Sequence, residues 1–146
     1  MTVLDSQAVI ALLRDEPAAD EVEAILRGRD GIASVSAVAL AEVFDVLVRA
    51  ARRRVDEVSL LVDTLFAAGL EVVPVDAEIG RLAGILRSRH WDRDRRPVSI
   101  VDCTVLATGM IAHEPIATGD AALIGAARAE GHPVVVLLDS QGRRPA

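Results

Sequence analysis

Lysine is absent from this sequence of 146 residues, so all 16 of its side chains of the Lys and Arg type are arginines. The absence excludes a receiver domain, which needs a lysine at its switch site, and a P-loop nucleotide-binding protein, which needs a Gly-Lys pair at the phosphates. Cysteine is nearly absent as well. The single thiol, Cys103, cannot form a disulfide within the chain, which is consistent with a reducing compartment.

Long hydrophobic runs are also missing. No stretch approaches the roughly 20 consecutive apolar residues that a membrane helix needs. The first residues do not combine a basic region, an apolar core and a cleavage site, as a secretory signal does. We therefore expect a cytoplasmic protein.

Hydrophobic residues, in contrast, are plentiful at 51% of the chain, and the 26% of charged residues are scattered rather than grouped. A chain of this size with this composition can bury one sizeable core. We find no repeat, low-complexity segment or interdomain linker. The sequence therefore predicts a single domain over residues 1–140 and a flexible C-terminal tail over residues 141–146.

The formal net charge of -6 and the pI near 5.0 are not those of a protein that binds nucleic acid by bulk electrostatics. Any polyanion must be held locally. Two arginine-rich stretches, Arg49–Arg54 and Arg87–Arg96, could contact phosphates or an acidic partner. For the first stretch, a solvated helix end is the favoured interpretation.

Short β-rich apolar segments alternate with longer segments of helical period, which is typical of an α/β fold with a mainly parallel sheet. The expected strands cover about Thr2–Leu4, Ile32–Ser34, Leu70–Val75, Pro115–Thr118 and Pro133–Leu138. The expected helices cover about Ser6–Leu13, a segment opened by Pro17, Ala37–Arg53, Asp56–Ala68, Ala77–His90, Ser99–Ala112 and Ala121–Glu130. The glycines expected in left-handed caps after helices are Gly28, Gly31, Gly69 and Gly131.

Two aspartates follow expected strands. Asp5 comes directly after the first strand and Asp120 lies two residues beyond the fourth. In an open parallel sheet, ligands bind outside the carboxyl ends of the strands, so both residues are candidates for chemistry. Each could instead be only the N-cap of the helix that follows it. A dehalogenase-type phosphotransferase also has an aspartate after its first strand, but it needs a second one where this sequence has Gln7.

Asp102 and Glu42 lie on helices whose surroundings are apolar. Asp102 is the one charged residue between Ser99 and Ala112, and its alternative role is a capping box with Ser99. Glu42 has mostly apolar neighbours three and four residues away, and its alternative is a solvated position at the helix edge. A buried carboxylate needs a cation or hydrogen-bond donors to compensate its charge.

If these four carboxylates converge, a positive charge must offset their repulsion, and no lysine exists to do so. Hard divalent cations such as Mg²⁺ or Mn²⁺ take oxygen ligands from carboxylates, so the set indicates a metal site. Zinc is disfavoured, because His90, His113 and His132 have no paired ligand spacing and the chain has one cysteine.

At these residues the sequence resembles the PIN-domain ribonucleases, and most closely the VapC toxins of bacterial type II toxin-antitoxin systems. The resemblance covers nearly the whole chain, through four short segments in the family's order. They are VLDSQAVIALL at Val3–Leu13, SAVALAEVFDVL at Ser36–Leu47, SIVDCTVLATG at Ser99–Gly109 and IATGDAAL at Ile116–Leu123. The sequence departs from the pattern around Asp120, where Gly119, Ala121 and Ala122 give a plainer setting than many relatives show.

The resemblance implies a three-layer α/β/α sandwich around a mainly parallel sheet, and a homodimer. It implies that Asp5, Glu42, Asp102 and Asp120 are the catalytic acids and metal ligands, Asp5 and Asp102 being the principal ones. Supporting positions are implied for Ser6, Ser99 and Thr118. The implied cofactor is Mg²⁺, with Mn²⁺ as an alternative, and the implied reaction is RNA hydrolysis that leaves a 5′-phosphate and a 3′-hydroxyl.

The resemblance also implies two partners, an RNA substrate, for example a structured RNA such as tRNA, and a cognate VapB-like antitoxin. Candidate contacts to RNA are Arg89, Trp91, Arg93, Arg95 and Arg96, although Trp91 could equally pack under its own loop. The apolar surplus of Ala37–Arg53 and Asp56–Ala68 could form a groove for the antitoxin, or serve the core or the homodimer. The alternative function is a catalytically silent PIN-like scaffold that binds RNA or protein.

Overall fold

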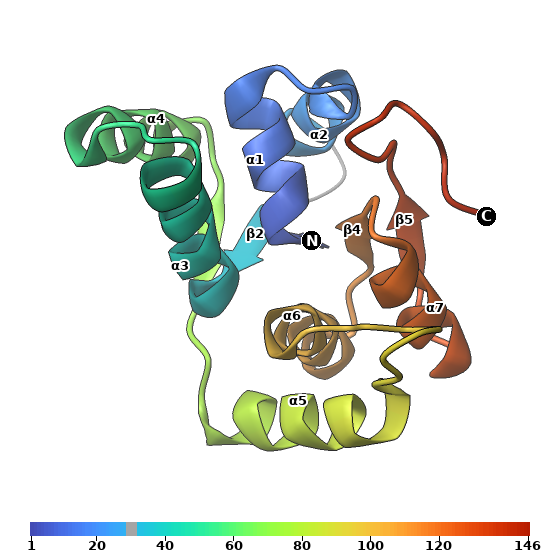
Figure 1. The fold of residues 1–146 in the computed structure, drawn as a ribbon. Helices are drawn as coiled ribbons and strands as arrows, with labels where there is room; N and C mark the ends of the chain where they lie inside the picture. The colour runs from blue at the N-terminus through green and yellow to red at the C-terminus, as the bar shows by residue number, and fades with distance from the viewer. Residues whose placement is uncertain (29–31) are drawn as a thin grey trace.

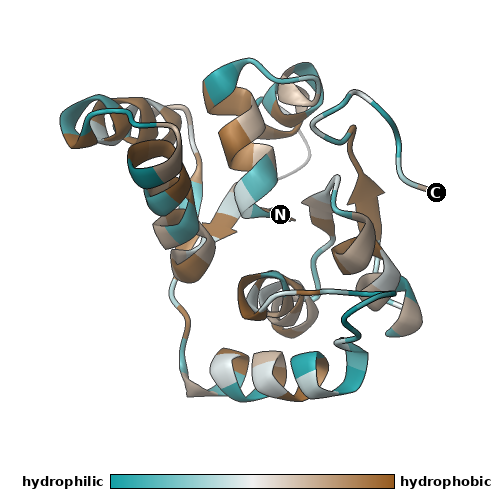
Figure 2. Ribbon diagram, viewed as in Figure 1, coloured by the Kyte–Doolittle hydropathy of each residue, from teal (hydrophilic) through white to brown (hydrophobic). Residues whose placement is uncertain are grey.

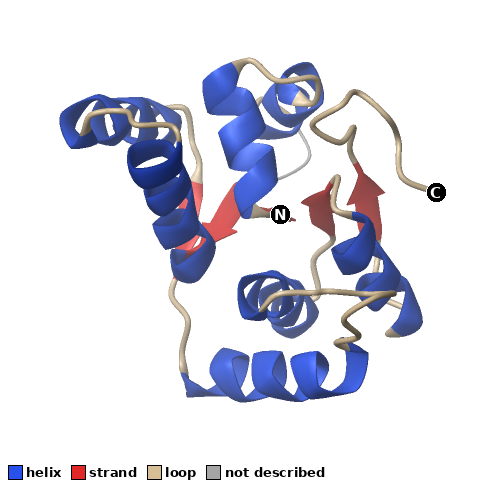
Figure 3. Ribbon diagram, viewed as in Figure 1, coloured by secondary structure: helices blue, strands red, loops and turns tan. Residues whose placement is uncertain are grey.

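The computed structural model describes residues 1–28 and 32–146 as a parallel sheet between layers of helices (Figures 1 and 3). The strands are β1 (Thr2–Leu4), β2 (Ala33–Ser36), β3 (Glu71–Val73), β4 (Ile116–Thr118) and β5 (Val134–Val136). The helices are α1 (Ser6–Arg14), α2 (Ala19–Leu26), α3 (Ala37–Asp45), the π-helical turn η1 (Val46–Ala50), α4 (Val55–Ala67), α5 (Ala77–His90), α6 (Ile100–Ala112) and α7 (Ala121–Ala129).

All strand pairs are parallel, and the strand order in the sheet is β3-β2-β1-β4-β5. Val3 at the centre of β1 faces Ser34 of β2 on one side and Ile116 of β4 on the other. The chain leaves β1 toward β2 and β3, and later leaves β4 toward β5. The order therefore reverses between β1 and β4, and such a switch point opens a crevice at the carboxyl ends of the two strands.

Helices cover both faces of the sheet, as expected. Figure 1 shows α1 and α2 on one side of the strands and α5 and α6 on the other. Helix α6 contacts β1, β2 and β4, and α5 packs outside it. Gly109 permits this close packing, because a Cβ there would lie 2.6 Å from Cγ2 of Ile116. The expected three-layer α/β/α sandwich is confirmed.

The core lies between the sheet and these helices. Among the fully buried side chains are Leu4 and Ile116 from the strands and Leu106 and Leu123 from the helices. Each such side chain stabilises the fold by roughly 1.5–3 kcal/mol through removal of apolar area from water. Figure 2 shows many hydrophilic residues, coloured teal, in the helices, in the loop after α5 and in the C-terminal segment.

The expected segment Ala37–Arg53 was wrong as one continuous helix. The α-helix ends at Asp45, and the backbone then widens into η1, where Ala51 donates a hydrogen bond to the carbonyl oxygen of Val46, five residues back, at 2.8 Å. Arg52 adopts a left-handed conformation with a φ of 55°, which ends the helical path.

Several other boundaries differ from the expected ones. Pro17 stands in a turn, and α2 begins two residues later, at Ala19. The second strand continues to Ser36, and the third and fifth strands are shorter than the apolar runs that predicted them, because a run of apolar residues does not record where pairing stops. Ser99 is the N-cap of α6 rather than its first residue.

The glycine predictions have mixed outcomes. Gly69 and Gly131 have positive φ values of 106° and 68° after α4 and α7, as expected. Gly28 does not have a positive φ. Helix α2 ends at Arg27, whose backbone is in the right-handed helical region, so no left-handed cap forms there. Gly31 lies outside the described residues.

Residues 141–146 carry no helix or strand and run back along the surface. Arg144 donates hydrogen bonds to the carbonyl oxygen of Val136 and, at 3.0 Å, to Glu21. Arg128 of α7 donates to the carbonyl oxygen of Ala146 at 2.5 Å. The flexibility of this tail stays a prediction. Across residues 1–28 and 32–146, none of the helices has the length and apolarity needed to cross a membrane.

Candidate metal centre

The acidic residues selected from the sequence come from four elements around the switch point. Asp5 follows β1, Asp120 follows β4, Asp102 lies in the first turn of α6 and Glu42 lies on α3. Helix α3 contacts both α1 and α6, and these contacts bring Asp102 and Glu42 toward Asp5 and Asp120. Repulsion from Asp102 and Asp120 contributes to a raised pKa of Asp5, and repulsion from Asp120 and Glu42 contributes to a raised pKa of Asp102.

Asp5 is the most deeply buried of the four, with 1% of its surface exposed. Its Oδ1 accepts a hydrogen bond from the backbone N–H of Ala8 at 2.6 Å, and its Oδ2 accepts one from the hydroxyl of Thr118. Burial raises the pKa of Asp5 to about 7, against the lowering effect of these two hydrogen bonds. A carboxylate in this position would be stabilised by a positive charge beside it.

Thr118 connects two of the acids. Its side chain is fully buried, and its hydroxyl oxygen accepts a hydrogen bond from the backbone N–H of Asp120 at 2.9 Å while it donates to Asp5. The residue thus fixes the turn after β4 relative to the end of β1. The resemblance implied a supporting position for Thr118, and that functional role stays a prediction.

Asp102 is held by a complete capping box at the start of α6. The backbone N–H of Ser99 donates to Oδ2 of Asp102 at 2.7 Å, and the backbone N–H of Asp102 donates to Oγ of Ser99 at 3.0 Å. Burial is the main cause of the raised pKa of Asp102, and the hydrogen bonds from Ser99 act in the opposite direction. No hydrogen bond to Oδ1 of Asp102 occurs within the described part of the chain.

Glu42 and Asp120 complete the set. Glu42 is half-buried on α3 and accepts a hydrogen bond from the hydroxyl of Ser6, which follows Asp5 directly. Asp120 is half-buried and accepts a hydrogen bond from the backbone N–H of Leu123 at 2.8 Å, so it caps α7. The prediction of N-caps at Asp5 and Asp120 is confirmed as local geometry, and a capping carboxylate can still offer its other lone pairs to a ligand.

The donor set fits a hard divalent cation in chemistry: it consists of carboxylate oxygens, and the described residues place no arginine or histidine in contact with Asp5 or Asp102. In the described ranges, however, no three His, Cys, Asp or Glu side chains form a group that could hold a metal ion as they stand. The caps at Asp5, Asp102 and Asp120 direct one oxygen of each of these three carboxylates toward the start of its own helix.

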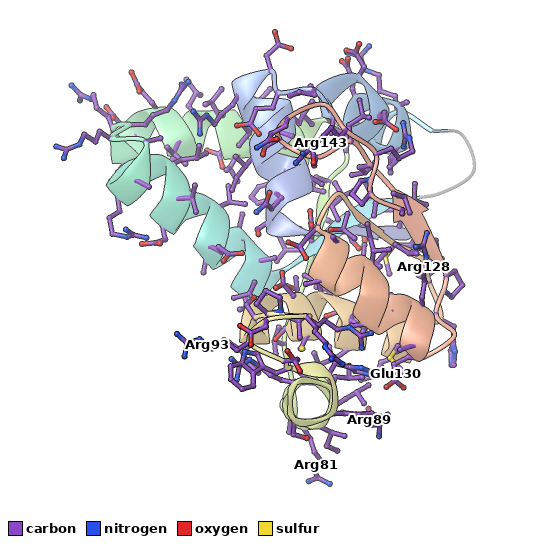
Figure 4. All side chains as sticks on the ribbon, turned by 45° about the vertical axis from the view of Figure 1, so that its right-hand side comes forward. Arg81, Arg89, Arg93, Arg128, Glu130 and Arg143 are labelled. Carbon is purple, nitrogen blue, oxygen red and sulfur yellow. The ribbon has the colours of Figure 1, made fainter. Side chains whose placement is uncertain are left out.

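The five candidate RNA-contact residues divide into two sets. Arg89 donates to Glu130 at 2.7 Å, and Arg96 donates to Nδ1 of His90 at 2.9 Å and lies over Gly125, where a Cβ would meet its Nε at 3.3 Å. Arg89 therefore joins the last turn of α5 to the C-cap of α7, and Arg96 joins the loop after α5 to the end of α5 beside Gly125 of α7. Figure 4 shows Arg89 and Glu130 close together.

Trp91, Arg93 and Arg95 form the second set, with exposed side chains. Trp91 is 49% exposed, and the guanidinium of Arg87 lies over its ring at 5.5 Å from the centroid. Neither Arg93 nor Arg95 has an ion pair with any described residue. The members of this set are the ones free to contact a ligand.

Sequence reasoning missed the clamp formed by His90 and Glu130. Nε2 of buried His90 lies 2.5 Å from Oε1 of Glu130. Because Arg96 donates to Nδ1, that nitrogen must accept, and Nε2–H then donates to Glu130. The two residues are 40 positions apart, and no motif links them.

Comparisons with solved structures give the same fold. A chain of the VapBC2 complex from Rickettsia felis, bound to a DNA fragment from its promoter, has a TM-score of 0.71 at 13% identity, covering 93% of this chain and 98% of that one. VapC20 of Mycobacterium tuberculosis, a sarcin-ricin loop cleaving toxin, has a TM-score of 0.69 at 19% identity, covering 86% and 95%. A FitAcB chain from Neisseria gonorrhoeae has a TM-score of 0.61 at 23% identity, covering 92% and 96%.

None of the curated protein sequences compared with this chain matches it. The family model of the PIN domain, however, matches residues 2–129, which include all four acids. With the acids at the switch point of a parallel sheet, this match shows that the chain belongs to the PIN domain family.

Proposed function

We propose that this protein is a metal-dependent endoribonuclease and the toxin of a toxin-antitoxin pair. The observation that carries the proposal is the buried carboxylate of Asp5, whose pKa is raised to about 7 among other acids and without an arginine or histidine contact in the described residues. A carboxyl group in that setting is suited to a cation ligand. The similarity to VapC20, a sarcin-ricin loop cleaving toxin, supports the direction of the proposal.

In the proposed site, Asp5 and Asp102 are the principal ligands of Mg²⁺ or Mn²⁺, and Glu42 and Asp120 complete the set. A divalent cation held there would supply an activated water for in-line attack and would offset charge on the phosphate oxygens. Water adds to phosphorus, the 3′-oxygen leaves and takes a proton, and the products carry a 5′-phosphate and a 3′-hydroxyl.

The protein's own contribution is to fix the positions of the carboxylate groups before a cation binds. Thr118 fixes Oδ2 of Asp5, Ser6 fixes Glu42, and the backbone N–H of Ser99 fixes one oxygen of Asp102. Residues locked by such supporting contacts lose little further freedom when a ligand binds. We assign Ser6, Ser99 and Thr118 to this positioning role.

The proposed substrate is a single-stranded segment of a structured RNA, for example of a tRNA. Trp91 offers an exposed aromatic face for an unstacked base, and Arg93 and Arg95 offer guanidinium groups for phosphates. Arg89 and Arg96, which bind Glu130 and His90 within the protein, act through the position of this loop.

A VapB-like antitoxin and a second copy of the chain are the proposed protein partners. The support is an apolar surface on α4, where Val55 is 60% exposed and Leu60 is 69% exposed. A complex is stabilised when a partner covers exposed apolar side chains of this size. The similarity to VapBC and FitAcB complexes agrees with a toxin that is held by its partner.

The test uses purified protein, a mixed RNA pool, and either Mg²⁺ or EDTA. We expect cleavage and a higher melting temperature with Mg²⁺, and cleavage at least about 100-fold slower in Asp5→Asn. The matched control is Asp76→Asn, since Asp76 caps α5 in the same way, through Ile79, but lies outside the acid cluster. If Mg²⁺ does not stabilise the protein and RNA binding survives in Asp5→Asn, the catalytically silent scaffold would be established instead.

A further inference from the structure

We propose that a hollow beside Asp120 is a subsite for the RNA backbone, in which Arg143 contacts a phosphate next to the one that is cleaved. The inference rests on the proposed function and names a contact outside the acid cluster. The inference is based on three observations. There is a hollow in the surface, a glycine shapes this hollow, and a guanidinium group at the wall of the hollow keeps unused hydrogen-bond donors.

The hollow lies between three segments that are distant in sequence. Gln7 comes from the first turn of α1, Gly119, Asp120 and Ala121 come from the turn after β4, and the C-terminal segment supplies the third wall. That wall consists of Asp139, Ser140, Arg143, Arg144 and Pro145. The space measures about 520 Å³, which is within the range of sites that hold a small ligand, roughly 300–1,000 Å³.

Gly119 brings the third wall to the acid. A Cβ at this position would lie 2.5 Å from the carbonyl oxygen of Leu138, so only glycine allows the chain after β5 to pass this close to the turn that carries Asp120. Ala121 continues the small side chains along the same edge. The plain surroundings of Asp120 in the sequence are thus what leaves room beside it.

Asp139 fixes Arg143 at the wall. Its carboxylate accepts hydrogen bonds from the backbone N–H groups of Gln141 and Arg143, both at 2.8 Å, and from Nε of Arg143 at 3.2 Å. These bonds hold the pKa of Asp139 below its usual range, so it stays charged near neutral pH. The guanidinium is therefore anchored through one nitrogen.

The two terminal nitrogens of Arg143 have no hydrogen-bond partner among the described residues. Arg144 differs, because Val136 and Glu21 occupy both of its terminal nitrogens. A guanidinium with two free, parallel donors matches the geometry of a phosphate. Since the chain carries a net charge of -6, a phosphate near the acids needs such a local cation.

The experiment measures RNA binding rather than cleavage. In the Asp5→Asn background, which removes the proposed catalytic carboxylate, we measure the affinity for a short single-stranded RNA of mixed sequence with and without Arg143→Gln. We expect about tenfold weaker binding, the effect of losing one charge-assisted hydrogen-bonded contact. The slope of log affinity against log salt should fall by about 0.7, as for one phosphate on a single strand.

The matched control is Arg81→Gln on α5, an exposed arginine that Figure 4 shows at the opposite end of the molecule from Arg143. Its affinity should equal that of the background. Arg143→Lys should bind with an affinity between those of the background and Arg143→Gln, because it keeps the charge but loses the paired donors. All variants should have the melting temperature of the background, because the side chain of Arg143 is 70% exposed.

The contact is located by replacing one phosphate of the RNA at a time with an uncharged methylphosphonate. With Arg143 present, one position should weaken binding most, and Arg143→Gln should be insensitive at that position. Equal affinity of Arg143→Gln and Arg81→Gln would overturn the subsite while RNA binding itself stands, and so would a loss spread evenly over all phosphates. Absence of RNA binding by the Asp5→Asn protein would overturn both the subsite and the proposed function.

Discussion

Thr118 donates its hydroxyl hydrogen bond to Asp5, 113 residues earlier in the sequence, and accepts one from the backbone N–H of Asp120. One buried hydroxyl therefore joins the ends of the two strands that flank the switch point. The pair defines where the acid cluster lies, and it leads to the first prediction.

Replacing Thr118 with valine keeps the shape of the side chain and removes both hydrogen bonds. We expect the free energy of unfolding to fall by about 1–3 kcal/mol, because the N–H of Asp120 loses its partner. The pKa of Asp5 should rise further, since the hydrogen bond from Thr118 lowers it. Urea unfolding and the pH dependence of cleavage measure the two effects.

Thr118→Ser should behave like the parent protein, because it keeps the hydroxyl. Thr64→Val on α4 is the matched control, since its exposed hydroxyl donates only to the carbonyl oxygen of Leu60. A Thr118→Val protein with unchanged stability and an unchanged pH profile would contradict the positioning role.

The second prediction concerns stability against pH in the absence of metal. Folding raises the pKa of Asp5 from 3.8 to about 7, so between these values the folded chain binds a proton that the unfolded chain has lost. The free energy of unfolding should therefore be highest, for this group, below about pH 4 and should fall as the pH rises toward about 7. The loss is on the order of 2–4 kcal/mol.

Asp5→Asn removes this titration. We expect its stability to be flatter than that of the parent over the same pH range and higher above about pH 7, and we expect Mg²⁺ to stabilise the parent only. The measurement is a series of chemical denaturation curves with EDTA. Parallel pH profiles for the two proteins would show that Asp5 does not carry a raised pKa.

The third prediction tests the close approach at Gly119. Gly119→Ala places a Cβ 2.5 Å from the carbonyl oxygen of Leu138, so the chain after β5 must move, and we expect a loss of about 1–3 kcal/mol. Gly84→Ala on α5 is the control: a Cβ there meets nothing within 4 Å, and alanine should stabilise the helix by up to about 1 kcal/mol. The measurement is the melting temperature of both variants. Equal melting temperatures would argue against the close approach of Gly119 and Leu138.

The fourth prediction concerns the clamp that holds the loop after α5. Glu130→Ala removes the acceptor for Arg89 and His90, so we expect residues 91–97 to become more accessible to hydrogen exchange and to proteolysis after arginine. RNA cleavage should fall with the loss of loop order. Glu78→Ala, an exposed position in the first turn of α5, should leave both unchanged. Unaltered exchange in Glu130→Ala would remove the clamp as a positioning device.

Much of the fold followed from local patterns. The five strands and seven α-helices of residues 1–28 and 32–146 were expected close to their positions, because apolar runs bounded by caps indicate which segments must be buried. The helix expected over Ala37–Arg53 was wrong in its second half, since the π-helical turn at Val46–Ala50 and the left-handed Arg52 have no counterpart in hydrophobic periodicity.

The site divides in the same way. Asp5 and Asp120 were selected by their places after strands, and both follow strands at the switch point. The clamp between His90 and Glu130 and the position of Arg143 beside Asp120 were not foreseen, because each depends on contacts between segments that no spacing relates. Arg89 and Arg96 looked like their neighbours in the sequence but are engaged within the protein.

The sequence by itself determined the class of fold and the family, and it selected the four acids as candidates, because the alternation of apolar segments and the order of short motifs can be read along the chain. Only the tertiary structure decided how deeply Asp5 is buried, that Thr118 joins it to Asp120, and which arginines keep free donors. Burial and hydrogen bonding are properties of surfaces that meet after folding, and a carboxylate acquires its unusual pKa only when those surfaces exclude water from it.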